Sequence, residues 1–183
     1  MKLTKLAIAT IFAASVVPLS SMADNSGTIN FVGSVVNTPC NIEQSSLKQT
    51  VDFGQLSRKA LESGKAAEAD FDIKFTGCDF TNFGKDESDQ PVAVKSMELV
   101  FTGQSYADDS NTLLATSTGN VNNLGIMIDG FEFGKTKDIL SNITNQTGDN
   151  TLTFKALAKA VDASKDVSEG KFSAISNFRI TYQ

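Results

Sequence analysis

Apolar and polar residues alternate over residues 27–36, near the start of the chain. Four residues share one face of an extended backbone there: Ile29, Phe31, Gly33 and Val35. Period-two alternation with β-branched and aromatic residues predicts a strand over residues 28–36 that buries one face. Strands so near a chain end are often poorly tied down, so the sheet that this strand joins is the first question the sequence raises.

The same alternation recurs along the rest of the chain in short segments separated by polar, Gly-rich or Asn-rich stretches. It predicts strands at residues 49–53, 70–77, 92–102, 125–129, 151–160 and 171–182. Residues 55–69 read as a loop with at most a turn or two of helix, which Ser57 could cap, and residues 141–150 read as a loop. Many short strands with turn signals between them predict an all-β sandwich in one domain.

The last predicted strand is as apolar as the first. One face carries Phe172, Ala174, Phe178, Ile180 and Tyr182, with Ser176 breaking the row. An apolar strand of this kind is central or covered, because a bare edge aggregates. Two interpretations follow. The two ends pair within a self-contained secreted sandwich that binds a ligand, or the sandwich lacks a strand and the N-terminal segment completes a neighbouring copy.

A leader precedes the mature chain. Lys2 and Lys5 form a positive start, residues 6–17 are apolar, and residues 21–23 give a small-x-small cleavage signal. This pattern predicts a secretory signal peptide over residues 1–23, and the apolar run is too short for a membrane span. In an exported chain with two cysteines, Cys40 and Cys78 are expected to form a disulfide.

The amino-acid composition argues against several kinds of catalytic and binding site. The chain has 21 Asp and Glu against 16 Lys and Arg, which argues against nucleic acid as a partner. It has no histidine, which removes Ser-His-Asp and Cys-His nucleophilic systems and the commonest zinc ligand. The acidic residues at 86–89 and 108–109 lack the spacing of a calcium loop and read as solvated loops. We therefore expect neither an enzyme nor a bound cofactor or metal.

Three motifs in register resemble chaperone–usher fimbrial subunits of the type 1 major-subunit family. They are the run from Gly27 through Val36 to Cys40, the second cysteine after an alternating strand at Cys78, and the pair of Gly170, fourteenth from the end, with the penultimate Tyr182. The resemblance covers the whole mature chain. It implies an exported subunit of an extracellular fimbrium on a bacterial surface, which supports cell adhesion.

In that family the subunit is an immunoglobulin-like sandwich that lacks its seventh, C-terminal strand. The resemblance implies that residues 24–36 form a donor-strand extension and residues 37–183 the pilin domain. A periplasmic chaperone would fill the groove first, and the next subunit's extension would replace it at the outer-membrane usher. The residues so assigned are Ile29, Phe31, Gly33 and Val35 in the donor strand and Gly170, Phe172, Ala174, Phe178, Ile180 and Tyr182 in the acceptor groove.

The partners implied are other copies of the chain, other pilus subunits, the chaperone and the usher. Among roles, we favour the repeating shaft subunit, with a minor adaptor as the alternative. A tip adhesin normally carries an added receptor-binding domain, for which residues 24–183 leave no room.

Overall fold

The computed structural model describes residues 27–117 and 122–183, so the predicted signal peptide and residues 24–26 lie outside it. The chain divides into two units, Met1–Val35 and Val36–Gln183. In the first unit, residues 27–35 belong to no helix or strand, and neither does Val36 in the second. The strand predicted over residues 28–36 is therefore not formed within this chain. An extended segment becomes a strand only through backbone pairing with a neighbour, and the alternating pattern alone cannot supply one.

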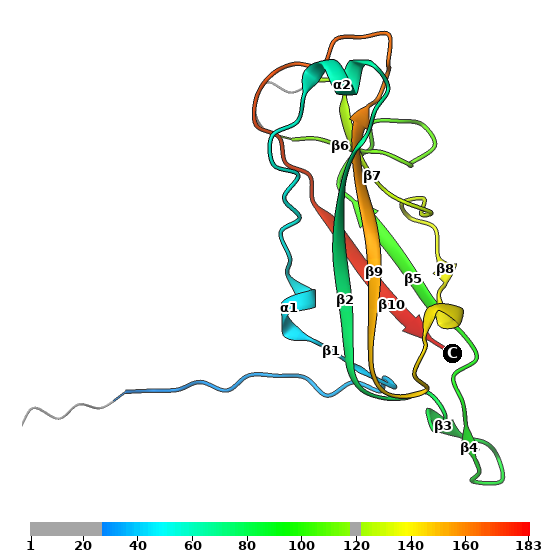
Figure 1. Ribbon diagram of the computed structural model, residues 1–183. Coiled ribbons are helices and arrows are strands. Elements are labelled where there is room, and N and C mark those ends of the chain that lie inside the picture. Colours follow the sequence, from blue (N-terminus) through cyan, green and yellow to red (C-terminus); the bar gives the residue numbers. More distant parts are fainter. Residues whose placement is uncertain (1–26, 118–121) are drawn as a thin grey trace, which may run out of the picture. The chain divides into compact units, whose positions relative to one another are not determined.

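The regular structure of the second unit consists mainly of antiparallel strands (Figure 1). The larger sheet has the order β1-β2-β9-β7-β6 and comprises β1 (Asn41–Ile42), β2 (Ala67–Asp79), β9 (Thr147–Ala160), β7 (Leu124–Ile128) and β6 (Leu114–Ala115). The smaller sheet has the order β10-β5-β8 and comprises β10 (Ser176–Tyr182), β5 (Met97–Gly103) and β8 (Lys137–Asp138). A two-stranded ribbon joins β3 (Gly84–Lys85) to β4 (Pro91–Val92).

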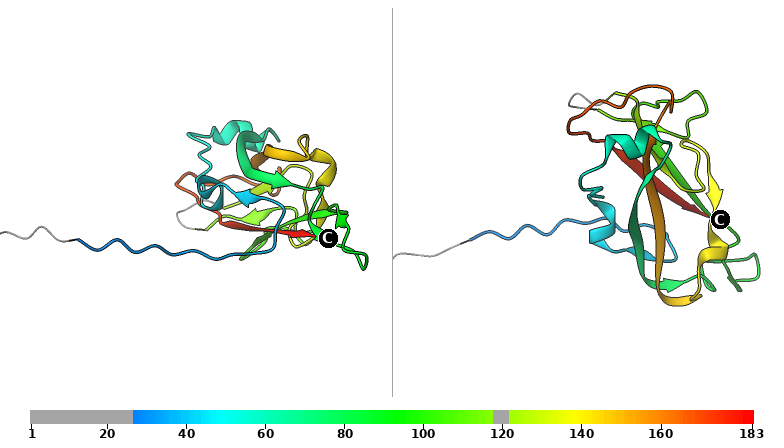
Figure 2. Two further views of the ribbon diagram at one scale, coloured as in Figure 1. Left: turned by 90° about the horizontal axis from the view of Figure 1, so that it is seen from below. Right: turned by 45° about the horizontal axis from the view of Figure 1, so that its top comes forward.

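The two main sheets face one another and share one core. In Figure 1, β10 and β5 cross β2 and β9 at an angle, and the two layers separate in the views of Figure 2. Phe101 of β5 sits between them, with its ring 6.1 Å from Phe71 of β2 and 5.7 Å from Phe154 of β9. The largest fully buried side chains are Phe75, Phe80, Ile73, Met97 and Leu99. The all-β sandwich predicted from the sequence is confirmed.

Several strand boundaries differ from the prediction. β9 begins at Thr147, inside the predicted loop of residues 141–150, because the side chain of buried Asn150 forms hydrogen bonds with the backbone of the turn before it. The Asn150 side chain accepts from the backbone N–H of Asn145 at 2.9 Å and donates to the Asn145 carbonyl at 2.9 Å. At the C-terminus the strand starts at Ser176, so Phe172 and Ala174 precede it in irregular chain.

In the described part of the chain, helix is limited to short pieces: α1 (Gln44–Leu47), α2 (Arg58–Glu62) and the 3-10 turn η1 (Leu140–Asn142). The predicted cap at Ser57 is present, since its side chain accepts from the backbone N–H of Ala60 at 3.4 Å. Within residues 27–117 and 122–183, no helix has the length and apolar character needed to cross a bilayer.

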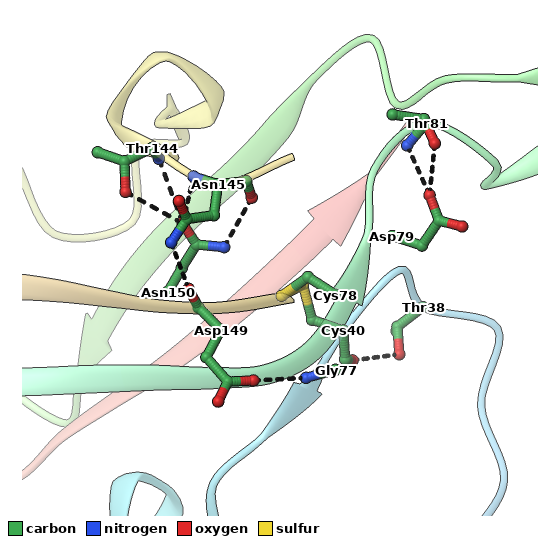
Figure 3. The surroundings of a disulfide bond; sticks show 10 residues. All are labelled: Thr38, Cys40, Gly77, Cys78, Asp79, Thr81, Thr144, Asn145, Asp149 and Asn150. Atoms are coloured by element: carbon green, nitrogen blue, oxygen red, sulfur yellow. Dashed lines mark hydrogen bonds between the residues drawn. A yellow bond between two sulfur atoms is a disulfide. The ribbon is translucent and has the colours of Figure 1, made fainter. Parts of the chain in front are cut away.

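The predicted disulfide joins Cys40 to Cys78 (Figure 3). It lies where β2 departs from regular pairing with β9, at a register shift between Phe75 and Cys78. Gly77 occupies this bulge with φ +59°, a conformation that favours glycine, and its N–H donates to Asp149 at 2.9 Å. The bridge fastens the residues just before β1 to the end of the longest strand pair in the molecule.

The loop before β6 is organised by one carboxylate. Asp108 accepts from the backbone N–H groups of Thr112 and Leu113 at 2.9 Å each, and from the hydroxyls of Ser110 and Thr112. Burial opposes ionisation of Asp108, but these hydrogen bonds outweigh it and lower its pKa to about 2. Ionised Asp108 thus fixes the turn that delivers Leu113 and Leu114 to the core.

We predict that Asp108→Asn lowers the free energy of unfolding at neutral pH by about 1 kcal/mol, since an amide accepts these bonds less strongly. Because the folded pKa lies below the unfolded value, the carboxylate stabilises the protein above about pH 4 and ceases to do so as the pH falls towards 2. Urea unfolding at pH 7 and at pH 2 measures this. The gap between variant and native protein should close at the lower pH, and an equal gap at both would contradict the assignment.

Candidate functional site: an apolar groove beside the last strand

The last strand has a neighbour on one side only. β10 pairs antiparallel with β5 over its full length, from Ser176 opposite Gly103 to Tyr182 opposite Met97. In the part of the chain that the structure describes, β10 has no second partner strand. It is therefore an edge strand, although it carries the apolar row that the sequence indicated.

The hydrogen bonds of β5 show which groups of β10 face the open edge. The Met97 carbonyl accepts from Ile139, and the Phe101 carbonyl accepts from Gly134, each at 2.8 Å. These two residues therefore turn their backbone groups away from β10. In an antiparallel ladder, hydrogen-bonded and non-bonded pairs alternate. The residues of β10 whose N–H and C=O groups point outward are thus Ser176, Phe178, Ile180 and Tyr182.

A groove of about 1080 Å³ runs beside this edge. One bank consists of residues 46–56, and the other consists of residues 167–176 together with Phe178. Its floor includes apolar side chains from both main sheets: Phe71, Phe101, Leu114, Leu124, Ile126, Ile128 and Ala156. A single water occupies about 30 Å³ of liquid, so this volume suits a row of side chains.

The two banks meet at one end of the groove. The rings of Phe53 and Phe172 lie 6.2 Å apart, and the Arg58 guanidinium lies 3.8 Å from the Glu169 carboxylate. Gly170 lies on the second of these banks with φ +142°, which favours glycine. An exposed ion pair contributes little stability, so the aromatic contact is the main link between the banks.

The predicted acceptor residues divide into two groups. Gly170, Phe172, Ala174 and Phe178 line the groove. Ile180 and Tyr182 lie further along β10, half-buried, and are not among the lining residues. The Tyr182 ring instead lies against Phe80 and Phe83, at 6.5 and 6.3 Å.

The sequence interpretation missed the opposite bank and most of the floor. The strand predicted over residues 49–53 is not formed, since these residues belong to no helix or strand, and nothing in the sequence marked residues 46–56 as a groove wall. The floor residues read simply as core. Their exposure to a groove depends on which strands are neighbours in space, which alternation does not encode.

In the first unit, the predicted donor residues are exposed. Ile29 is 78% exposed, Phe31 90% and Val35 103%. Side chains of this size normally gain about 1.5–3 kcal/mol each when buried. An extended, apolar and uncovered segment of this kind is suited to binding a partner.

Tyr182 holds a buried phenol with an unusual feature: its hydroxyl has no hydrogen-bond partner among the described residues. Burial raises the pKa of this phenol to about 12, because it disfavours the phenolate. The ring is held by aromatic packing rather than by a polar contact.

The arrangement defines a class of protein. It is an immunoglobulin-like sandwich with an open strand edge beside a groove whose floor consists of core residues, in a chain that also carries an uncovered apolar extension. Within the described residues, no group of His, Cys, Asp and Glu side chains is arranged to hold a metal ion. The chemistry available at the groove is strand addition: main-chain hydrogen bonds along β10 and apolar burial beneath them.

Comparisons with known proteins agree with that class. The family model for fimbrial proteins matches residues 29–183, so this chain belongs to the fimbrial protein family. It is 37% identical over 171 residues to the KS71A fimbrillin of Escherichia coli, covering 90% of this chain and 88% of that one. It is 36% identical over 165 residues to the Pap fimbrial major pilin protein of Escherichia coli, covering 86% and 84%.

Among solved structures, the P pilus rod subunit PapA superposes with a TM-score of 0.62 at 33% identity, covering 80% of this chain and all of that one. The chain is therefore a structural subunit of a fimbria, an extracellular filament in which pilin subunits polymerise. The resemblance identified in the sequence is confirmed.

We predict that Tyr182→Phe leaves the free energy of unfolding unchanged or raises it by about 1–3 kcal/mol, since it removes a buried hydroxyl without a partner. Urea unfolding at neutral pH measures this. Because the folded pKa lies above the unfolded value of about 10, the native protein keeps its neutral-pH stability up to about pH 10 and loses stability as the pH rises towards 12, where the phenol ionises more easily in the unfolded chain. That loss should be smaller in the variant. A variant clearly less stable at neutral pH would show that the hydroxyl makes a favourable contact.

Proposed function

We propose that this chain is the repeating shaft subunit of its fimbria and that each copy is completed by the N-terminal extension of the next. The observation that carries this is the groove beside the open edge of β10, in a chain whose extension exposes Ile29, Phe31 and Val35. The relatives named as major pilin and as rod subunit support the shaft role.

The N-terminal extension is long enough to span the last strand, β10. β10 has seven residues and spans about 23 Å at roughly 3.3 Å per residue. Residues 27–35 span about 30 Å when extended, by the same rise. The extension is therefore long enough to run along the whole of β10.

The joint gains free energy from two sources. Burying the three large donor side chains contributes about 5–9 kcal/mol before the cost of ordering the extension. Backbone hydrogen bonds to β10 add about 0.5–1.5 kcal/mol each. Since the groove floor consists of core residues of both sheets, filling it also completes the fold of the receiving copy.

The same groove requires a temporary occupant before assembly. An open apolar edge aggregates, so an exported subunit needs cover until the next copy arrives. A periplasmic chaperone that inserts a strand, followed by exchange at an outer-membrane usher, supplies this cover. Because each copy both donates and receives, the contact is heterologous and generates a filament.

We predict that Phe31→Asp abolishes polymerisation, because it places a charge where a large apolar side chain must be buried. Full-length protein exported with its chaperone and usher should give an SDS-resistant ladder of multiples on unheated gels. The variant should accumulate in the periplasm as single subunits still bound to chaperone.

Val32→Asp is the matched control. Val32 is adjacent and 96% exposed, but it belongs to the opposite face of the extension. This variant should keep the ladder. Equal loss in both variants, or a ladder unaffected by Phe31→Asp, would contradict the proposed insertion.

A further inference from the structure

We propose that the joint between copies has a second, outward-facing contact, in which Val36 of one copy packs against Ile175 of the copy that it completes. This rests on the proposed function. Ile175 is 62% exposed on the groove bank, directly before β10, and Val36 is 65% exposed at the end of the extension. Both are large apolar side chains that the filled groove does not itself bury.

The pairing register follows from the sizes of the side chains. An extension antiparallel to β10 turns its inward residues towards the inward row of β10, and well-packed layers set large side chains against small ones. One register places Gly33 opposite Phe178 and Val35 opposite Ser176. It also places Phe31 opposite Ile180.

Moving the extension by two residues gives poorer matches. In one direction Phe31 meets Phe178 while Gly33 meets Ser176, which crowds one pair and leaves a gap at the next. In the other direction Val35 meets Phe178 and Gly33 meets Ile180, which crowds the first pair and sets the polar Asn37, not an apolar residue, opposite Ser176. A one-residue shift is excluded, because it would turn the apolar row outward.

The favoured register fixes the outer row as well. The residues of β10 that face outward there are polar or charged: Asn177, Arg179 and Thr181. Immediately before them comes Ile175, and the register sets Val36 directly opposite. The outward pairs of this ladder are the non-hydrogen-bonded ones, because Ser176 and Phe178 use their backbone groups to bind the extension. In such pairs the Cα atoms lie about 4.5 Å apart and the side chains touch.

The contact places an apolar cover over the part of the groove that lies beside the start of β10. There the core beneath includes Leu114, which lines the groove. A Cβ atom added to Gly103 would lie 3.6 Å from the carbonyl oxygen of Ile175. The Ile175 backbone therefore lies against the end of β5. The Val36–Ile175 pair would thus keep water from the last inserted side chain, Val35.

Disulfide trapping tests the contact in assembled fimbriae of the full-length chain. Val36→Cys with Ile175→Cys should give a covalent ladder that survives boiling in SDS and disappears on reduction, because the Cα separation falls within disulfide range. Ser34→Cys with Ile175→Cys is the matched control. In the favoured register these two positions are diagonal neighbours about 7–8 Å apart and should not link. Linking by the control pair instead would overturn the register and the contact together.

A double-mutant cycle measures the contact without cysteines. In homopolymers of Val36→Thr, Ile175→Thr and the double variant, each single change should speed dissociation in warm SDS about two- to five-fold, the effect of losing one cross-strand pair. The double variant should dissociate more slowly than the product of the two single effects predicts. Val32→Thr with Ile175→Thr is the control cycle and should be multiplicative.

Two failures are distinguishable. If the native chain forms no ladder of multiples, the proposed function is contradicted, and the contact falls with it. If the ladder forms while the Val36–Ile175 cysteines do not link and the cycle is multiplicative, only the outer contact is contradicted.

Discussion

The structure depends on one constraint: the last strand, β10, has hydrogen-bonding groups on both edges and, among the residues that the structure describes, a partner strand on only one. Its outward backbone groups belong to the same residues whose side chains face the core. A molecule that covers those groups must therefore also cover the core beneath them. Backbone pairing and apolar burial cannot be satisfied separately at this edge.

Because backbone pairing and apolar burial go together at this edge, the groove is lined by side chains from both sheets. Phe71 from β2, Phe101 from β5 and Ile126 from β7 reach it from different layers. An occupant that fills the groove thus fastens the two sheets together, as an internal strand would. Under the proposed assembly, filling the groove would add to the stability of the receiving copy, because a partner that binds only the folded state stabilises it.

Much of this could be predicted from the sequence, because period-two alternation reports which side chains are buried. The rows on β2 and β10, the Ser57 cap and the Cys40–Cys78 pair are present as expected. The start of β9 was missed because its Asn- and Thr-rich turn looks like a loop until Asn150 is seen to be buried. The groove bank at residues 46–56 was missed because these residues line a groove only through the segments that lie opposite them in space. The alternation of apolar and polar residues does not predict which strands are neighbours in the sheets.

The Cys40–Cys78 bridge has a mechanical consequence. The extension leads directly into Cys40, and the bridge connects that point to the end of β2, which pairs with the 14-residue β9. Tension arriving from a neighbouring subunit would enter the sandwich through a covalent bond rather than through α1, α2 and the intervening loops. The 37 residues between the two cysteines, which include β1, both helices and most of β2, lie inside a closed ring and cannot be extended by that tension. A filament built this way would transmit a pull from joint to joint through the long β2–β9 pair of each subunit.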